Sequence, residues 1–376
     1  MTTLSQTIAR LASARTAPAA AAEAVNRLGD LPAFAPNPGA LRARTYIPAG
    51  AGPGAPLVVV LHGCTQTAAG YDQGAGWSTL ADREGFALLF PEQVRANNPN
   101  LCFNWFMPGD IGRTGGEAES IAGMIEAMLA THQLDRRRVF VTGLSAGGAM
   151  AAVMLATYPE LFAGGAIIGG LPYACASGVP EALARMRGQG GGNDADLATA
   201  VRLASGGHDG PWPAVSIWHG TADATVSSSN MDQLGRQWRS IHGVDGTAPA
   251  TAAGPGWTRQ TWRGADGRDL VEEWSVAGMG HGVPLDVGGP DALGASGPYM
   301  LDVGLSSTAA IARGWGLLRD GPVEIEESNV LVPALDERPT PGRARPRTAP
   351  ILAEADVTGG VQRTIENALR SAGLMR

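Results

Sequence analysis

Short apolar runs alternate with segments of helical periodicity through the middle of the chain. Residues 56–61 (PLVVVL) are continuously apolar, a pattern typical of a strand that is covered on both faces of a sheet. The same reasoning predicts buried strands at 86–90, 139–142, 163–168 and 214–218, and helices at 77–84, 117–130 and 146–158. Strands and helices that alternate in this way predict an α/β fold, with a mostly parallel central sheet and helices on both faces.

Three segments depart from this alternation. Residues 41–47 alternate between polar and apolar positions, as an edge strand does. Two strand-like runs at 256–262 and 269–276 flank a Gly-Ala-Asp-Gly turn, which predicts a hairpin. Residues 175–213 form a glycine-rich insertion with one short predicted helix at 194–203. Insertions of this length frequently shape a pocket.

The two ends of the chain differ in composition from the part between them. Residues 1–38 predict a short helix and a Pro-rich connector, and residues 321–376 predict a Pro/Arg-rich linker and a final short helix. We therefore expect a single catalytic domain over residues 39–320. The terminal helices are expected to dock on this domain or on another subunit, so the sequence is compatible with a homo-oligomer.

The composition fits a large globular domain and argues against some partners. The 376 residues are 44% hydrophobic, enough to bury a large core. The net charge of -7 argues against nucleic acid as a partner, because phosphate binding needs a basic face. No segment approaches the roughly 20 apolar residues that span a bilayer. We therefore expect no transmembrane segment.

The N-terminal segment bears on localisation. Residues 1–22 mix Thr, Ser, Gln and Arg with isolated Leu and Ile, and they lack the continuous apolar core of a secretory signal. We expect the chain as printed to be cytoplasmic, and to be secreted if an export signal precedes it.

A candidate nucleophile lies where the strand at 139–142 runs into the helix that begins at 146. The junction is Gly143-Leu144-Ser145-Ala146-Gly147, a G-x-S-x-G motif in the strand–turn–helix context of a nucleophile elbow. The turn is tight, so a side chain two residues before or after the serine would collide with neighbouring elements. The pattern alone occurs by chance in a chain with 53 glycines. The strand before it and the helix after it favour the elbow, and make Ser145 the candidate nucleophile.

A serine hydroxyl needs a general base, and the base needs an orienting acid. On an elbow of this kind the partners follow the serine in the order acid, then histidine. His281 lies in a Gly-flanked loop after the last strand of the body, where a base could face both serine and substrate. The other histidines lie before the serine, at strand or helix ends, or in the insertion: His62, His132, His208, His219 and His242. His281 is therefore the predicted base.

The candidate acid is Asp223, which comes just after the strand at 214–218. The carboxyl ends of parallel strands are where α/β sheets place catalytic groups. The alternative is an Asp that caps a turn, a common role for this side chain. The preceding strand, the short spacing after it and the position of Asp223 between Ser145 and His281 favour the catalytic interpretation. Asp286 and Asp302 come after His281 and break the order.

Acyl transfer also needs backbone N–H groups directed at the developing oxyanion. The N–H of Ala146, at the start of the helix after Ser145, is one predicted donor. The other should come from the loop His62-Gly63-Cys64-Thr65-Gln66, with Cys64 as the strongest candidate through its backbone. A cysteine nucleophile is the alternative, but no base has a suitable spacing. No cluster of residues has metal-ligand spacing, and no glycine-rich phosphate loop is present, so we expect no metal and no organic cofactor.

These segments together resemble the polyhydroxybutyrate (PHB) depolymerase family of esterases, which is related to feruloyl and acetylxylan esterases. The resemblance rests on 62–66 (HGCTQ), 102–105 (CFNW), 143–148 (GLSAGG), His219-Gly220 with Asp223, and 280–282 (GHG), and it covers roughly residues 40 to 318. It implies the α/β-hydrolase fold and hydrolysis of carboxylic esters through an acyl-enzyme. It also implies the triad Ser145, Asp223 and His281, with Cys64 and Ala146 as oxyanion donors.

The resemblance leaves the substrate and the cysteines open. It implies an ester substrate of hydroxyalkanoate type, which can be polymeric, and secreted relatives imply that Cys64 and Cys102 could pair. A feruloyl or acetylxylan esterase would use the same machinery. A non-catalytic scaffold that binds polymer granules through the terminal helices is the alternative of another class. Aromatic residues at 77, 105, 106 and 218 are candidates to line the pocket; Trp105 is the strongest, because its Pro/Asn/Gly-rich loop is not expected to be buried throughout.

Overall fold

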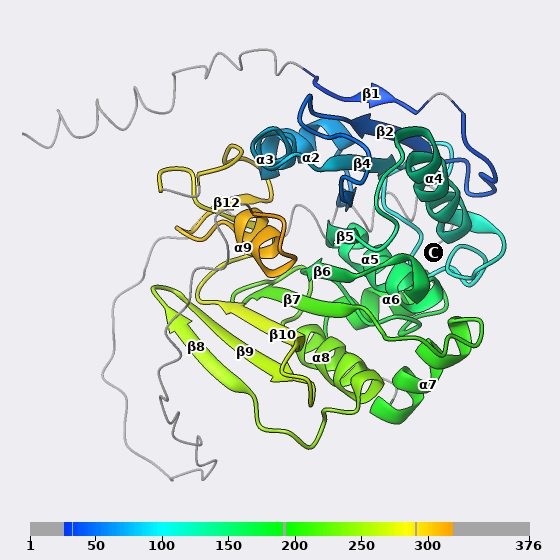
Figure 1. Ribbon diagram of the computed structural model, residues 1–376. Coiled ribbons are helices and arrows are strands. Elements are labelled where there is room, and N and C mark those ends of the chain that lie inside the picture. Colours follow the sequence, from blue (N-terminus) through cyan, green and yellow to red (C-terminus); the bar gives the residue numbers. More distant parts are fainter. Residues whose placement is uncertain (1–25, 32, 191–192, 290–291, 319–376) are drawn as a thin grey trace, which may run out of the picture.

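One large sheet organises the part of the chain that the computed structural model describes, residues 26–31, 33–190, 193–289 and 292–318 (Figure 1). Its ten strands are, in spatial order, β1 (Gly29–Asp30), β2 (Arg42–Tyr46), β4 (Ala87–Glu92), β3 (Leu57–Leu61), β5 (Val139–Leu144), β6 (Gly164–Ile168), β7 (Ala214–Gly220), β10 (Asp269–Val276), β9 (Trp257–Arg263) and β8 (Ala250–Gly254). A separate parallel pair is formed by β11 (Val283–Leu285) and β12 (Met300–Asp302).

The centre of the sheet is parallel and its two margins are antiparallel. Strands β4, β3, β5, β6, β7 and β10 run parallel to one another. Strands β1 and β2 on one side, and β9 and β8 on the other, pair antiparallel. The predicted mostly parallel sheet is confirmed. Because β3, β5 and β7 are parallel, their carboxyl ends lie at the same end of the sheet.

Helices cover both faces of this sheet, as the alternating pattern predicted. They are α2 (Ala68–Ala75), α3 (Trp77–Glu84), α4 (Gly116–His132), α5 (Ala146–Thr157), α6 (Val179–Met186), α7 (Asp194–Ala204), α8 (Ser229–His242) and α9 (Ser307–Gly314), with a 3-10 turn at Pro159–Leu161. The strand β3 shows why both faces are apolar. Leu57, Val59 and Leu61 belong to the same buried cluster as apolar side chains of α4, α5, α7 and α8, whereas Val58 and Val60 belong to the cluster that includes α2, α3 and α9.

Two sequence predictions need correction. The strand β2 is not at the edge, because the two-residue strand β1 pairs with its outer side. The insertion at 175–213 contains two helices, α6 and α7, rather than one. Pro180 in the first turn of α6 and the glycine run after the helix are typical of a loop, and they hide this eight-residue helix in the sequence. The hairpin of β9 and β10 is confirmed, and β8 extends it by a third strand.

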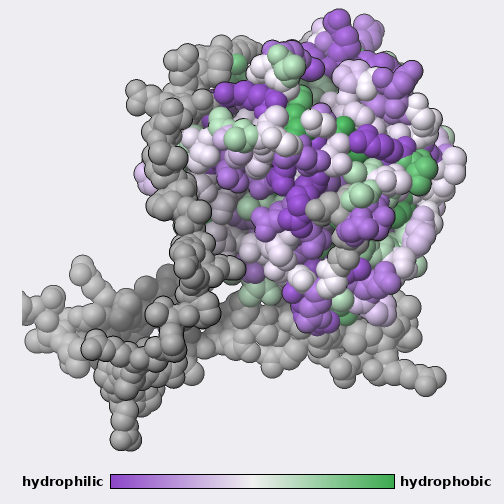
Figure 2. All heavy atoms as spheres, turned by 90° about the horizontal axis from the view of Figure 1, so that it is seen from below, coloured by the Kyte–Doolittle hydropathy of each residue, from purple (hydrophilic) through white to green (hydrophobic). Residues whose placement is uncertain are grey.

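The predicted terminal helices lie outside the described residues. Within the described part, no helix is both long enough and apolar enough to cross a bilayer. On the coloured part of the face in Figure 2, hydrophilic residues surround small hydrophobic patches. Three large apolar side chains of the described part are exposed: Met107, Leu203 and Val287.

Candidate active site

Ser145 occupies the turn between β5 and α5, as the elbow prediction requires. Its φ of 58° and ψ of -118° place it in a region that side chains rarely adopt, which is a form of strain found at functional sites. The conformation is held from both sides. Ser145 N donates to the carbonyl of Ile168 at 2.9 Å, and Ser145 O accepts from Ala149 N at 2.8 Å.

The two glycines of the motif allow β3 to pass close to the turn. A Cβ at Gly143 would lie 2.5 Å from the backbone of Gly147, and a Cβ at Gly147 would lie 2.2 Å from the carbonyl oxygen of Leu61. Backbone atoms cannot move aside as a flexible side chain can, so both positions need glycine. The predicted collision two residues on either side of Ser145 is confirmed.

Asp223 and His281 are hydrogen-bonded although they are 58 residues apart in the chain. Asp223 lies in the turn after β7, and its Oδ2 is 2.7 Å from His281 Nδ1. Its Oδ1 accepts from the backbone N–H groups of Thr225 at 2.9 Å and Val226 at 2.8 Å. Because the ionised carboxylate only accepts, His281 Nδ1 carries the proton and Nε2 is left as the basic nitrogen.

The Asp223 carboxylate is buried but remains ionised. Its side chain is 1% exposed, and burial alone would raise its pKa. The hydrogen bond from His281 and the backbone N–H of Val226 outweigh burial, so the pKa of Asp223 lies below its usual value. A permanently charged acid can therefore orient and stabilise a protonated His281.

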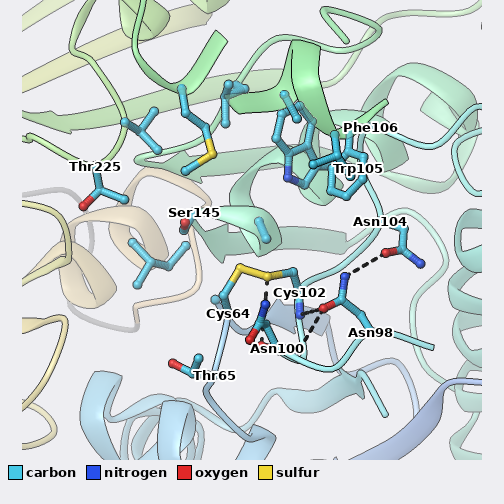
Figure 3. Close-up of a pocket in the computed structure, with 18 of the residues that line it drawn as sticks. Cys64, Thr65, Asn98, Asn100, Cys102, Asn104, Trp105, Phe106, Ser145 and Thr225 are labelled. Carbon is cyan, nitrogen blue, oxygen red and sulfur yellow. Dashed lines mark hydrogen bonds between the residues drawn. A yellow bond between two sulfur atoms is a disulfide. The ribbon is translucent and has the colours of Figure 1, made fainter. Parts of the chain in front are cut away.

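The predicted residues meet at one cavity of about 460 Å³. Ser145, Ala146, Cys64, Trp105 and His281 all line it. In Figure 3, Ser145, the Cys64–Cys102 disulfide and the Trp105–Phe106 pair surround this space. Asp223 does not line the cavity, as expected for an acid that acts through the histidine.

The hydrogen bonds around Cys64 leave its amide as the available oxyanion donor in that loop. Gly63 N donates to Gln66 Oε1 at 2.8 Å, and Thr65 N donates to the carbonyl of Asn100 at 2.6 Å. The Cys64 amide lies between these two engaged groups. On the other side, Ala146 N begins α5, where N–H groups lack intrahelical partners. The arrangement thus fits the predicted pair of donors.

His62 is a structural residue rather than a base. It is 1% exposed, and its Nδ1 lies 2.8 Å from the carbonyl of Gly63 while its Nε2 accepts from Gln93 N at 3.1 Å. Burial lowers its pKa, which keeps the ring neutral. The role of His62 is to hold the end of β3 and the start of the Cys64 loop.

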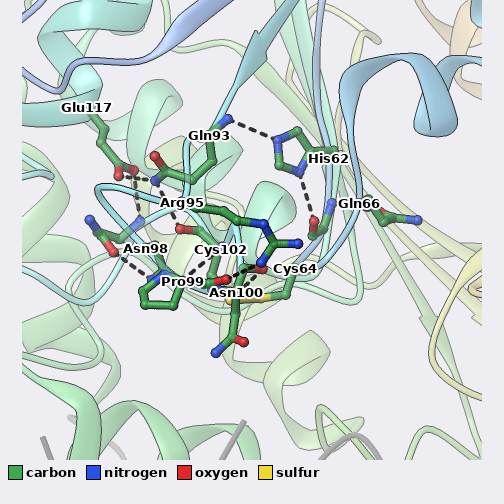
Figure 4. The surroundings of a disulfide bond; sticks show 12 residues. His62, Cys64, Gln66, Gln93, Arg95, Asn98, Pro99, Asn100, Cys102 and Glu117 are labelled. Carbon is green, nitrogen blue, oxygen red and sulfur yellow. Dashed lines mark hydrogen bonds between the residues drawn. A yellow bond between two sulfur atoms is a disulfide. The ribbon is translucent and has the colours of Figure 1, made fainter. Parts of the chain in front are cut away.

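A disulfide joins Cys64 to Cys102, with their Cα atoms 4.2 Å apart and a sequence separation of 38 (Figure 4). It ties the loop of Cys64 to the loop of Cys102 and Trp105, and both loops line the cavity. Cys175 remains a free, buried thiol, and burial raises its pKa to about 12. It has the inert character expected of a core cysteine.

Two buried polar residues that the sequence did not suggest support the Cys102–Asn104 segment of the pocket wall without lining the cavity themselves. Gln93 follows β4, and its side-chain amide donates to the carbonyl of Cys102 at 3.0 Å and to the Glu117 carboxylate. Glu117, in the first turn of α4, also accepts from Asn104 N at 2.8 Å. Glu117 is 1% exposed, and burial raises its pKa to about 8. Figure 4 shows Gln93 between His62 and Glu117.

The loop of Trp105 is not buried throughout, as expected, although the Trp105 side chain itself is only 6% exposed. It nevertheless lines the cavity, with its ring edge-on to Phe106 at 5.3 Å. Trp77 and Trp218 belong to the core on the other face of the sheet. Trp218 stacks on Trp274 there, at 4.2 Å.

The helix α6 completes the cavity with an apolar wall. Val179, Leu183 and Met186 line it. The carbonyl of Met186 accepts from Ser227 N at 2.7 Å, which fastens the end of α6 to the segment that follows Asp223. The prediction that the insertion shapes a pocket is confirmed. No metal-binding group of His, Cys, Asp or Glu occurs within the described residues.

Comparison with known proteins identifies the family of the chain. Residues 41–261 match the family described as Esterase PHB depolymerase. Poly(3-hydroxyalkanoate) depolymerase C of Paucimonas lemoignei is 42% identical over 301 residues, which cover 80% of this chain and 72% of that protein. Feruloyl esterase B of Talaromyces stipitatus is 32% identical over 262 residues, covering 68% of this chain and 72% of that protein.

The acetylxylan esterase of Coprinopsis cinerea is 32% identical over 277 residues, covering 72% of both proteins. Among solved structures, an acetyl xylan esterase from Aspergillus awamori aligns with a TM-score of 0.65 at 24% identity. The alignment covers 77% of this chain and 99% of that one. This structural likeness shows the α/β-hydrolase fold.

Proposed function

The chain belongs to the Esterase PHB depolymerase family and is a carboxylesterase, and we propose that it hydrolyses polyhydroxyalkanoate-type esters with Ser145, Asp223 and His281 as its catalytic triad. The observation that carries the triad is the 2.7 Å contact between Asp223 Oδ2 and His281 Nδ1, with His281 and Ser145 lining the same cavity. The proposed substrate rests on the 42% identity to a poly(3-hydroxyalkanoate) depolymerase.

In the proposed mechanism, His281 Nε2 removes the proton of the Ser145 hydroxyl as Oγ attacks the ester carbonyl carbon. The carbonyl oxygen becomes an oxyanion that accepts hydrogen bonds from the N–H groups of Cys64 and Ala146. The C–O bond then breaks, the protonated His281 gives its proton to the leaving alkoxide, and an alcohol departs. An acyl-enzyme on Ser145 remains.

Deacylation repeats these steps with water as the nucleophile. His281 takes a proton from water, the hydroxide attacks the acyl carbon, and the proton passes to Ser145 Oγ as the carboxylic acid is released. Asp223 stays ionised throughout and stabilises the imidazolium of His281. The low pKa of Asp223 supports this role.

The cavity suits an apolar acyl chain of moderate size. Leu183 and Met186 of α6 line the cavity together with Trp105, Phe106 and Ser145. Feruloyl or acetylxylan ester hydrolysis is the second candidate, because relatives named for these activities are 32% identical to this chain.

Two measurements test the proposal. A fluorophosphonate probe should label wild-type protein at Ser145 and should not label Ser145→Ala, with circular dichroism showing that the variant is folded. Hydrolysis rates for hydroxybutyrate oligomers should exceed those for methyl ferulate and acetylated xylan. Labelling that persists in S145A would refute the nucleophile, and a preference for methyl ferulate would refute the substrate class.

We also propose that the protein acts in an oxidising compartment. The Cys64–Cys102 disulfide supports this, because such bonds are rarely maintained where thiols are kept reduced. Fractionation of the source cells, with mass spectrometry of the two cysteines, checks it. Recovery of the protein from the cytosol with both thiols reduced would contradict the proposal.

A further inference from the structure

We propose that His219 is a positioning residue of the esterase, and that its Nε2–H fixes Asp223 and limits how strongly Asp223 attracts His281. This inference rests on the proposed triad and assigns a role to a second histidine beside the acid. His219 belongs to β7, four residues before Asp223, and does not line the cavity.

The geometry shows which nitrogen of His219 carries the proton. Nε2 lies 2.8 Å from the carbonyl oxygen of Val226 and 3.4 Å from Asp223 Oδ2. A carbonyl oxygen can only accept, so Nε2 must be the protonated nitrogen. Its N–H therefore donates to Val226 and points its positive end toward the carboxylate of Asp223.

Both backbone polar groups of Val226, its carbonyl and its N–H, are hydrogen-bonded to this pair of side chains. Its carbonyl accepts from His219, and its N–H donates to Asp223 Oδ1 at 2.8 Å. Asp223 N donates to the carbonyl of Gly220 at 3.2 Å. The turn between Gly220 and Val226 is thus closed around the ring of His219, which fixes the direction of the Asp223 side chain.

Two imidazoles approach the same carboxylate oxygen. His281 Nδ1 is 2.7 Å from Asp223 Oδ2, and His219 Nε2 is 3.4 Å from it. The second donor reduces the negative potential that His281 experiences. Without it, Asp223 would stabilise the imidazolium more strongly, so Nε2 of His281 would become protonated at a higher pH.

The remaining nitrogen of His219 argues against a role in packing alone. Nδ1 is buried and has no hydrogen-bond partner within the described part of the chain. An unpaired buried polar atom is unfavourable, and an apolar side chain would avoid it. Burial lowers the pKa of His219 and keeps it neutral, although the negative charge of Asp223 acts in the opposite direction.

Few titratable groups surround this pair. His219 experiences the charges of Asp223, His281 and Asp232 of α8. The ring of Tyr299 lies edge-on to His281 at 6.2 Å, and burial raises the pKa of its hydroxyl. If substitution of His219 shifts the low-pH side of the kcat/KM profile (its acid limb), the shift is therefore expected to arise through Asp223 and His281.

The test compares His219→Gln with His219→Asn in the full chain. The amide nitrogen of Gln can occupy the place of Nε2, whereas that of Asn reaches only the place of Nδ1. With p-nitrophenyl butyrate, H219Q should keep kcat and the wild-type acid limb of kcat/KM. H219N should lose kcat by about 2- to 10-fold, the range for one hydrogen bond to a neutral group. Its KM should be unchanged and its acid limb should move to higher pH.

Matched controls separate this role from folding. His242 is also buried and bonded to a carbonyl, that of Pro213 at 3.1 Å, but it lies at the end of α8 and does not line the cavity. H242Q and H242N should leave kcat and the acid limb unchanged. If H219N does not fold, as judged by its melting curve, H219L provides the same loss of the N–H.

The outcomes are distinct. If H219N or H219L matches H219Q in kcat and in its acid limb, the positioning role is refuted. If S145A keeps activity in the same assay, the proposed triad itself fails, which is a separate result. Rescue in H219Q together with a shifted acid limb in H219N supports the inference.

Discussion

Gln93 donates its backbone N–H to Nε2 of His62 at 3.1 Å, a contact between the ends of the neighbouring strands β4 and β3. The side-chain amide of the same Gln93 donates to the carbonyl of Cys102 at 3.0 Å. One residue thus supports both the loop of Cys64 and the loop of Cys102. The disulfide then joins these two loops directly. The Cys64 loop, which holds the proposed oxyanion donor, is therefore fixed by a network of contacts with other loops.

The acid of the triad is tested by Asp223→Asn. The amide would present N–H groups to His281 Nδ1 and favour the wrong tautomer, so we expect kcat to fall by about 10³- to 10⁴-fold. Steady-state kinetics check this, with the melting temperature as a measure of folding. Asp302→Asn is the control, because Asp302 is exposed and follows His281 in the chain. A near-normal kcat in D223N would show that another residue is the acid.

Removal of the disulfide should affect both stability and turnover. The bond spans 38 residues, for which the chain-entropy estimate is roughly 4 kcal/mol of unfolding free energy. We expect C64A/C102A to unfold at lower urea concentration and to have a lower kcat, because the Cys64 amide loses a fixed position. The control is C175A, which removes a thiol outside the disulfide. If C64A/C102A keeps wild-type kcat, the bond does not position the oxyanion donor.

Glu117 should make stability depend on pH. Burial raises its pKa from 4.5 to about 8 in the folded protein, so the folded state keeps a proton that the unfolded chain loses. The stability from this proton is complete below pH 4.5 and decreases as the pH rises to about 8. Relative to Glu117→Gln, which cannot titrate, wild-type melting temperature should fall across this range.

The comparison with E117Q removes the carboxyl of Glu117, and among the described residues Asp110 is the one other carboxyl whose charge acts on it. Glu126→Gln, on the same helix but paired with Arg136 at the surface, is the control. Melting curves for wild type and E126Q should remain parallel over the same range. Parallel curves for wild type and E117Q would contradict the high pKa of Glu117.

Trp105 should determine affinity for longer acyl chains. It is buried yet lines the cavity beside Phe106, so Trp105→Ala would remove a large apolar surface there. We expect KM to rise more for p-nitrophenyl hexanoate than for p-nitrophenyl acetate. Met107→Ala, at an exposed position on the cavity rim, should have a smaller effect. An equal change for both esters in W105A would place the acyl chain elsewhere.

The parts of the site that could be predicted are those with a local signature. Ser145 has glycines two residues to either side, and the reason for them, the close approach of β3, is confirmed by the backbone distances at Gly143 and Gly147. Asp223 could be predicted because it directly follows a recognisable strand. The long-range contact of Asp223 with His281 could be inferred only from their order in the chain.

The supporting residues could not be predicted, because their roles depend on partners that sequence does not place nearby. Gln93 bonds to His62, 31 residues earlier, and to Glu117, 24 residues later. His219 gave one signal, its position at the end of a strand, but nothing in the sequence indicates that its ring faces Asp223. The helix α6 was missed because Pro180 and the glycine run after the helix are typical of a loop, and the strand β1 because it has only two residues.

The conformation of Ser145 implies that catalytic activity and thermal stability favour different residues at this position. At its φ of 58° any residue with a Cβ is strained by roughly 1–3 kcal/mol, and glycine alone would relieve this. Ser145→Ala and Ser145→Gly are both expected to be inactive, but the glycine variant should melt at the higher temperature. The enzyme therefore keeps, at its most constrained position, a residue that the backbone by itself would not favour.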